Sequence, residues 1–435
     1  MAYGVRMHSF FSWRCCLKMI SGEGYSGLGK ISKSLGIDEF GQISVGLYSD
    51  NNLAFLGGGE VTIIDLGNFL SRAGMNVTIL DDTNSKDMKR VSNDTLAKML
   101  IARYSRAPYE TPGKLKFLYH PMPDIEALSS RDVNLIFVHR IPPVGYMEKV
   151  SKIRSRVALC FHGIGLQDKR PLNPIIRIYQ RYMRLALKRI SRKVNASNNI
   201  FFHVLTESTS SVLAKCGIRR DKIVVIPSGI DPNQYKVGRN ESKFTVLFMG
   251  RMDDLQKGIR RLRKVVRILG KIAPDIEIIA IGSGPDSPIL NNVHNNNFHY
   301  LGYVDAKIKD DLLLSSNLLL VTSNMDPFPL VCIEGLVSGL PIVTTPAAGP
   351  SEMVSLIRDS GKVSGFNGAK LATDILEYYQ QWVLDKKNYH IRKIARSNAA
   401  KLEFNIDCMN DNYRRFIESL YRTGEANPSS IDDYK

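Results

Sequence analysis

At 435 residues the chain is long enough for two or three domains, and its 44% hydrophobic and 23% charged residues are ordinary for a globular enzyme. The 59 Lys and Arg against 42 Asp and Glu give a formal charge of +17, so the surface must meet nucleotide phosphates, an anionic membrane or nucleic acid. No run approaches the roughly 20 apolar residues that span a bilayer, and the six cysteines form neither a CxxC pair nor a zinc spacing.

The first residues are basic but lack a clean apolar core and a small-residue cleavage site, so we do not interpret them as a signal peptide. We therefore expect a cytoplasmic protein with free thiols. Residues 1–42 are interpreted as an N-terminal extension. Residues 24–30 nearly match a phosphate-binding P-loop, but Ile31 stands where Ser or Thr would hold Mg²⁺, so we assign no site to them.

From residue 43 the pattern alternates between short β-rich runs and helices, which predicts a parallel sheet covered on both faces. A glycine turn and a helix over 61–72 follow the first strand. We expect this first Rossmann-like domain to span residues 43–230. Its expected strands are 43–47, 75–80, 134–139, 156–162, 201–206 and 222–227.

A polar stretch over 231–242 interrupts the alternation, which then restarts and predicts a second doubly wound domain over 243–400. Its expected strands are 244–250, 276–282, 318–323 and 341–345. Crossover helices are expected over 401–423 and a polar tail over 424–435. The helix near 411–421 has an apolar face, which we expect to pack back onto the first domain.

Glycines and cations follow the first strand of each predicted domain, where open parallel sheets bind ligands. The run Gly57-Gly58-Gly59 leads into a helix, and its backbone amides could approach a phosphate. In the second domain, Gly250-Arg251 is followed by Lys257-Gly258 at the start of a helix. Arg supplies a planar fork of donors and Lys a compact charge, and both could hold a diphosphate.

A third candidate is the segment from Asp326 to Glu334. Pro329 suits the first turn of a helix, and the amides of Leu330 and Val331 would face a phosphate oxygen. Glu334 lies one turn deeper and could accept hydrogen bonds from ribose hydroxyls, whereas Asp326 could reach a sugar hydroxyl.

These motifs occur in an order that resembles the GT-B retaining glycosyltransferases known as the glycosyl transferases group 1, or family 4. The order adds His162-Gly163, 227–231, 282–285 and 301–304 to the three segments above, and the resemblance covers roughly residues 43–423. It implies a GT-B fold, in which two Rossmann-like domains face a central cleft: the first domain holds the acceptor and the second the nucleotide-sugar donor. The expected reaction transfers a hexosyl-type group with retention of anomeric configuration.

The resemblance also implies roles for individual residues. Arg251 and Lys257 would bind the diphosphate and stabilise the leaving nucleotide, and His162 would lie beside the reacting sugar. The family's two glutamates, eight positions apart, correspond to Asp326 and Glu334, so the first is one methylene shorter here and its contact with the donor sugar is in question. Further donor-binding positions are expected at Gly58, Gly59, Gly250, Gly282, Gly284, Tyr303, Val304, Leu330 and Val331.

The resemblance implies no cofactor, because the nucleotide sugar is a substrate, and no metal. Acidic pairs such as Asp253-Asp254 are interpreted as loop and cap residues, and we nominate no protein nucleophile. Two other functions stay open. A nucleotide-sugar epimerase would use the same fold, and a nucleic-acid-binding protein would explain the charge, although no nucleic-acid-binding signature occurs and we expect no such partner.

A helix between the fourth and fifth strands of the first domain has basic side chains at steps of three or four. They form one narrow stripe: Arg177, Arg181, Arg184, Lys188 and Arg192. A packed surface helix with a solvated edge explains this pattern. An interfacial helix attracted to an anionic membrane explains it equally well, and would place the enzyme peripherally at the inner face of a membrane.

Overall fold

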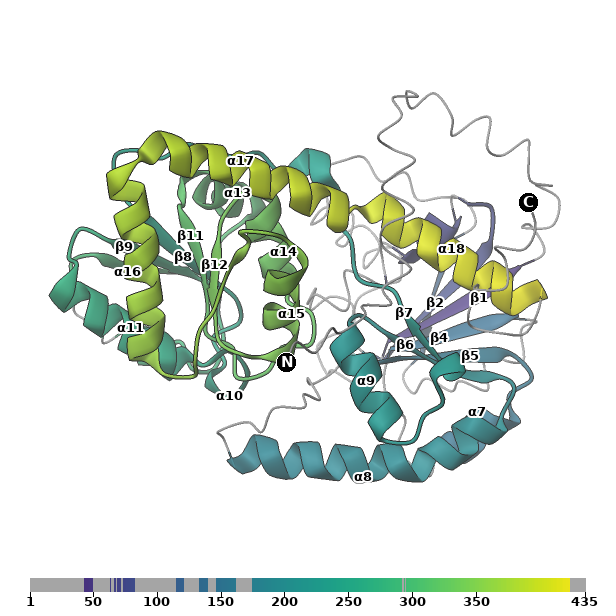
Figure 1. Cartoon of the computed structure of the whole chain (residues 1–435). Coiled ribbons are helices and arrows are strands. Elements are labelled where there is room, and N and C mark those ends of the chain that lie inside the picture. The colour runs from purple at the N-terminus through teal and green to yellow at the C-terminus, as the bar shows by residue number, and fades with distance from the viewer. Residues whose placement is uncertain are drawn as a thin grey trace, which may run out of the picture.

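A computed structural model provides the structure of the chain. It describes residues 43–49, 63, 66–67, 69–71, 73–82, 115–120, 133–139, 146–161, 174–291, 293 and 295–422. The N-terminal extension, the glycine run around Gly58 and Gly59, His162 and the polar tail lie outside these residues. Figure 1 shows two lobes, each built on its own sheet, with the yellow C-terminal helices passing from one to the other.

The first lobe is built on a seven-stranded sheet in the order β3-β2-β1-β4-β5-β6-β7, and every pairing is parallel. Its strands are β1 (Ser44–Ser49), β2 (Asn76–Asp82), β3 (Leu115–His120), β4 (Leu135–His139), β5 (Arg156–Phe161), β6 (Ile200–Val204) and β7 (Ile223–Val225). Its helices include α7 (Tyr146–Lys152), α8 (Pro174–Ala196), α9 (Glu207–Lys215) and the short η3 (Arg220–Lys222).

Successive residues of a strand point to opposite faces of the sheet. Apolar side chains pack on both faces of this sheet, as is usual for parallel sheets. In β4, Phe137 packs on one face with residues of β1 and of the C-terminal helix, whereas Ile136 packs on the other face with residues of α7 and α8. The described residues between 63 and 71 are helical and bury Ile63, Leu66 and Leu70 in the first of these cores.

The second lobe is built on a six-stranded parallel sheet in the order β10-β9-β8-β11-β12-β13. Its strands are β8 (Thr245–Met249), β9 (Glu277–Ile281), β10 (Phe298–Gly302), β11 (Leu318–Val321), β12 (Ile342–Thr344) and β13 (Gly361–Val363). Its helices are α10 (Asp254–Lys257), α11 (Ile259–Ile272), α12 (Pro288–Asn291), α13 (Ala306–Ser315), α14 (Leu330–Val337), α15 (Ala348–Leu356), α16 (Gly368–Leu384) and α17 (Lys386–Glu403).

The two doubly wound sheets confirm the predicted fold class. The strands expected from the sequence are present, with ends that differ by about two residues. Strands β3, β10 and β13 were not expected. The four predicted strands of the second lobe therefore form only part of its sheet.

The C-terminal helix α18 (Ile406–Arg422) crosses back onto the first lobe, as predicted. Its buried side chains join the core of the first sheet, where the ring of Tyr413 meets that of Phe137 edge-on at 5.8 Å. The Tyr413 hydroxyl also lies 3.3 Å from Nε2 of His203 in β6. Burial lowers the pKa of His203 to about 4, so the imidazole is neutral at physiological pH.

The chain passes between the lobes twice, and the two passages lie side by side. Ile230 on the outward passage pairs with Asn405 on the return in an isolated parallel bridge. The amide of Ile230 donates to the Phe404 carbonyl at 2.9 Å, and the amide of Ile406 donates to the Ile230 carbonyl at 3.0 Å. Gly229 fits here because a Cβ would lie 2.7 Å from the Asn405 backbone.

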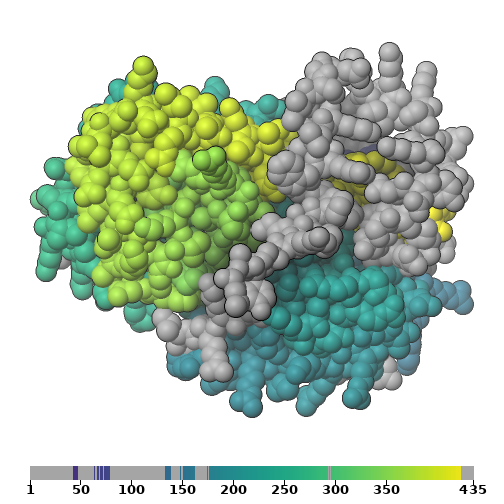
Figure 2. Space-filling view, in the orientation of Figure 1, coloured from purple at the N-terminus to yellow at the C-terminus, as the bar shows by residue number. Residues whose placement is uncertain are grey.

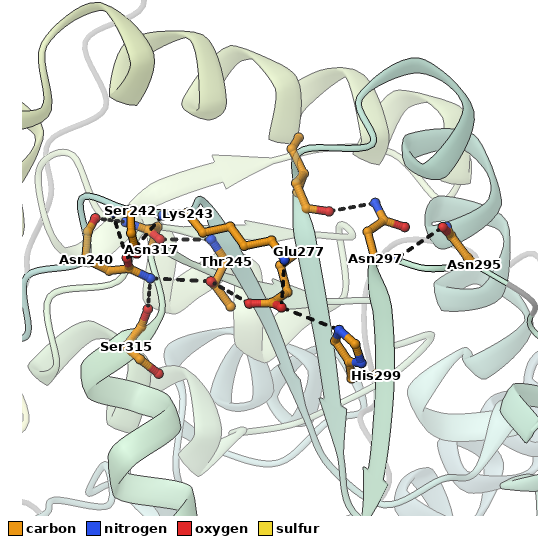
Figure 3. Close-up of polar contacts among 11 residues, drawn as sticks. Asn240, Ser242, Lys243, Thr245, Glu277, Asn295, Asn297, His299, Ser315 and Asn317 are labelled. Atoms are coloured by element: carbon orange, nitrogen blue, oxygen red, sulfur yellow. Dashed lines mark hydrogen bonds and ion pairs between the residues drawn. The ribbon is translucent and has the colours of Figure 1, made fainter.

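A network of polar side chains lies at the amino ends of β8 and β9 in the second sheet (Figure 3). Glu277 is its centre and accepts hydrogen bonds from Lys243 at 3.0 Å and from the Thr245 hydroxyl at 3.3 Å. Nε2 of His299 lies 3.4 Å from the same carboxylate. The network satisfies polar groups at the edge opposite to the carboxyl ends of the strands, so it does not contribute to the candidate site.

Candidate functional site

The candidate site lies at the carboxyl edge of the second sheet, between β8 and β11. Strand order reverses here, because β8 connects outward to β9 on one side while β11 lies on its other side. Open α/β sheets bind their ligands at such switch points, where the loops that follow the two strands diverge. The loop after β8 carries Gly250 and Arg251, and the loop after β11 carries Asp326.

Lys257 and Asp326 form an ion pair that joins these two loops. Both groups are largely withdrawn from solvent, with 17% of the Lys257 side chain and 7% of the Asp326 side chain exposed. A contact between residues 69 positions apart is formed because β8 and β11 are neighbours in the sheet. The site therefore brings together two of the residues predicted from the sequence.

The turn at Gly258 fixes the backbone that carries Lys257. Gly258 has a left-handed φ of 70°, which ends α10, and α11 begins at the next residue. A Cβ at this position would lie 2.2 Å from the carbonyl oxygen of Thr322, so only glycine allows the approach. The Thr322 hydroxyl donates to the Lys257 carbonyl at 2.7 Å and completes the junction.

Arg261 supports the same junction from α11 and was not predicted. Its guanidinium donates to Oδ1 of Asn324 at 2.8 Å, to the Phe366 carbonyl at 2.8 Å and to the Thr322 carbonyl. Burial lowers the pKa of Arg261. Because these three acceptors belong to two different loops of the second lobe, Arg261 holds the loops together.

The glycines of the predicted donor site allow loops to pack against one another. A Cβ on Gly282 would lie 1.9 Å from the Gly250 carbonyl oxygen, and one on Gly284 would lie 2.5 Å from the Met252 carbonyl oxygen. Gly250 and Gly282 both have positive φ, at 155° and 125°. These residues bring the ends of β8 and β9 into backbone contact and form the floor beside Lys257.

Helix α14 begins immediately after the Asp326 loop and points its N-terminus at the same edge. Pro329 is the N-cap residue, one position earlier than the first-turn position predicted, and no side chain caps the helix. The helix dipole and the amides of the first turn, at Leu330 and Val331, favour a negative group here. Gly349 of α15 donates to the Asp326 carbonyl at 3.0 Å and fixes the loop from behind.

Glu334 lies one turn into α14 and has two partners that sequence reasoning missed. Its Oε1 accepts from the Tyr235 hydroxyl at 3.1 Å and lies 2.5 Å from Nζ of Lys309. Tyr235 follows the short η4 (Pro232–Gln234), and Lys309 belongs to α13. Neither residue has a motif of its own. Lys309 could have been suspected because its helix follows the predicted 301–304 segment.

The other predicted residues are less closely engaged. The Arg251 side chain is 61% exposed and donates to Asp253 in its own loop at 3.0 Å and to Gln256 in the adjoining α10 at 2.7 Å. Tyr303 is 63% exposed, and Val304 packs partly into the core beneath it. Gly58, Gly59 and His162 lie outside the described residues, so their approach to Lys257 stays a prediction.

A carboxylate of the second lobe reaches the first lobe across the space between them. Glu352 in α15 accepts from the backbone amides of Glu207 at 2.9 Å and Ser208 at 3.0 Å, at the start of α9. It also accepts from the Ser208 hydroxyl. No motif suggested this contact, which is 144 to 145 residues long in sequence.

Comparison with known proteins identifies both halves of the chain. Residues 56–234 match the model of the glycosyltransferase family 4, and residues 230–397 match that of the glycosyl transferases group 1. The 2-deoxystreptamine N-acetyl-D-glucosaminyltransferase of Niallia circulans is 29% identical over 134 residues, which are 28% of this chain. The chain spans 34%, 60% and 44% of the length of three curated relatives that it matches.

Solved structures show the same fold over most of the chain. HepE of Anabaena, solved in complex with UDP and glucose, has a TM-score of 0.63 at 16% identity and covers 87% of this chain and 100% of its own. Sucrose-phosphate synthase of Thermosynechococcus elongatus has a TM-score of 0.66 at 14% identity, with coverage of 87% and 99%. The two family models and this GT-B fold agree: the chain belongs to the glycosyl transferases group 1, the family 4 glycosyltransferases.

Proposed function

We propose that this chain transfers a sugar from a nucleotide diphosphate sugar to an acceptor, with retention of anomeric configuration and without a metal ion. The observation that carries the proposal is the Lys257–Asp326 ion pair at the switch point of the second sheet, beside the uncapped N-terminus of α14. A cation and a helix N-terminus together suit a diphosphate, and the neighbouring carboxylate suits sugar hydroxyls.

Lys257 has the role of stabilising the leaving group. When the bond between the sugar and the diphosphate breaks, negative charge grows on the phosphate oxygen that departs. The Lys257 ammonium and the amides of the α14 first turn lie at the same edge of the sheet and would stabilise that charge, and the Arg251 guanidinium would join them on leaving its contacts with Asp253 and Gln256. Asp326 holds the ammonium over Gly250, and a Cβ on that glycine would lie 3.7 Å from Cε of Lys257. The cation is therefore oriented before the donor arrives.

Glu334 has the role of binding ribose. Both partners described above, Tyr235 and Lys309, contact Oε1. We assign Oε2 to the ribose hydroxyls of the donor, because an ionised carboxylate accepts several hydrogen bonds. Lys309 then has two effects: it fixes the rotamer of Glu334 and balances its charge close to the donor phosphates.

The comparisons support a nucleotide-sugar donor. HepE was solved with UDP and glucose and also with UDP-glucose, and it has the same fold as this chain. The curated relatives include transferases of N-acetylglucosamine and of mannose, so they leave the sugar and the acceptor open. Thermal shift measurements with UDP-, GDP- and ADP-sugars identify the base, because a ligand that binds the folded state raises its stability.

Lys257→Ala tests the assignment of the leaving-group residue. At saturating donor we expect kcat to fall by about 30- to 1,000-fold, equivalent to about 2–4 kcal/mol of transition-state stabilisation. Lys264→Ala is the matched control, because Lys264 is an exposed cation in α11 whose side chain packs against Gly368, and this variant should transfer normally. Full activity of Lys257→Ala under these conditions would contradict the proposed function.

A further inference from the structure

Helix α8 has an inner face that packs into the core of the first lobe. Ile176, Leu187, Ile190 and Val194 are almost completely buried there, beneath the first sheet. In Figure 1 the helix runs along the lower border of the first lobe, and its outer face points away from the sheet. The space-filling view shows the same blue segment at the lower edge of the molecule (Figure 2).

The outer face of α8 exposes three large apolar side chains. Ile178 is 71% exposed, Tyr182 is 66% exposed and Leu185 is 50% exposed. At 3.6 residues per turn the three lie within roughly 60° of one another around the helix axis. We call these three residues the apolar row. The sequence pattern placed them on faces beside the basic stripe, but the structure does not bury them.

Cations lie beside the apolar row. On the side of the basic stripe, Arg177, Arg181, Lys188 and Arg192 are exposed and Arg184 is half-buried. Arg189 and Lys193 are exposed as well, and the helix contains no Asp or Glu. An aromatic and two aliphatic side chains bordered by long basic ones suit the boundary between headgroups and acyl chains, where Tyr is favoured and Arg and Lys extend to phosphates.

We propose that the outer face of α8 binds an anionic membrane surface, with the apolar row inserted among the lipids and the flanking cations at their phosphates. The positive charge of α8 distinguishes between the possible partners of this face. A second copy of this helix would bring at least eight exposed cations together around the apolar contact, and the repulsion would oppose pairing. Nucleic acid would satisfy the cations but leave the apolar row without a use. Only an anionic surface with an apolar interior satisfies both groups.

Helix α11 in the second lobe provides a matched contrast. It also contains no Asp or Glu, and it exposes Arg260, Lys264, Arg267 and Lys271. Its apolar side chains at Ile259, Leu262, Val265, Val266 and Leu269 are buried. Only Ile272 at its end is exposed, at 59%. Helix α11 is therefore strongly basic, as α8 is, but has no apolar row.

The test is co-sedimentation of the full chain with vesicles of phosphatidylcholine and phosphatidylglycerol, compared with phosphatidylcholine alone. We expect binding to the anionic vesicles that weakens with salt, because the attraction acts within a Debye length. Three variants separate charge from insertion. One replaces the apolar row by Ser, one replaces Arg177, Arg181, Arg184 and Lys188 by Gln, and the control replaces Arg260, Lys264, Arg267 and Lys271 by Gln.

The α8 charge variant should lose at least about a hundredfold in vesicle partitioning, because each cation near an anionic surface contributes about fivefold. The apolar-row variant should lose about tenfold or more and should release completely at a salt concentration where the parent still binds. The α11 variant, with the same loss of charge, should stay within about threefold of the parent. Unchanged thermal transitions check that each variant folds, since all seven α8 positions are at least partly exposed.

Equal losses in the α8 and α11 variants would overturn the proposal, because net charge alone would then explain the binding. Parent-like binding of the apolar-row variant would overturn it as well. Sedimentation velocity checks the remaining partner: a parent dimer that the Ser substitutions convert to monomer would identify the face as a contact between copies. The proposal does not depend on sugar transfer. Donor binding is measured separately by thermal shift, and the shift that the donor produces should be the same in all α8 variants.

Discussion

The contact of Glu352 with the start of α9 predicts how the two lobes close. Its carboxylate receives three donors from the first lobe: two amides, at 2.9 and 3.0 Å, and one hydroxyl. Glu352→Gln keeps the shape but replaces one accepting oxygen by an NH₂ group, which would face at least one N–H or O–H that also donates. We therefore expect the loss of one charge-assisted hydrogen bond, which contributes about 1.5–3 kcal/mol to the free energy of lobe closure. The lower value applies here because the Glu352 side chain is partly exposed.

A loss of about 1.5 kcal/mol lowers the ratio of closed to open lobes roughly tenfold. Hydrogen exchange at the amides of Glu207 and Ser208 measures this directly, because the carboxylate protects both protons in the closed form. Exchange there should accelerate about tenfold in Glu352→Gln, and small-angle scattering should give a larger radius of gyration. Glu377→Gln is the control, because Glu377 pairs with Lys362 inside the second lobe. Unchanged exchange at both amides in Glu352→Gln would refute the reasoning.

Four further predictions concern the site and the cores. Asp326→Glu should retain transfer activity in a donor assay, because it restores the family's residue. Gly258→Ala should reduce both stability and kcat, since its Cβ would collide with the Thr322 carbonyl. Phe416→Ala should lower the free energy of unfolding by about 3–5 kcal/mol in denaturant titration, because the ring is 1% exposed. Burial lowers the pKa of Lys393 to about 7, so the unfolded chain binds more protons above that pH, and the free energy of unfolding should rise from pH 7 to 9 by up to roughly 1.4 kcal/mol per unit. Lys393→Met should remove that slope.

Most of the strands and the returning helix could be predicted from sequence because their evidence is local. The apolar residues 135–138 are buried on both faces of a parallel sheet, and the periodicity around Tyr413 and Phe416 indicates a helix with one face to bury. Strand β13 was not predicted because its three residues are Gly, Lys and Val, none of them fully buried, and they form no apolar run.

The site was predictable only in part, for a related reason. Lys257 and Asp326 follow strands, so the topology of the fold brings them together. Lys309 and Tyr235 meet Glu334 through side chains from a helix and a loop, and no spacing rule predicts such contacts. The contacts of Arg251 with Asp253 and Gln256 were equally unpredictable, because no spacing rule says whether these neighbours or a ligand will hold the guanidinium.

The paired passages of the chain at Ile230 and Asn405 limit how the lobes can move. Backbone hydrogen bonds join the outward and the returning segment, so sliding one lobe along the other would shear them apart. A rotation about this crossing keeps them intact, because both segments turn together. We therefore expect the crossing to act as a hinge between the lobes and the Glu352 contact to limit how far they close. Substitutions that stiffen the crossing should slow opening without altering any residue at the donor site.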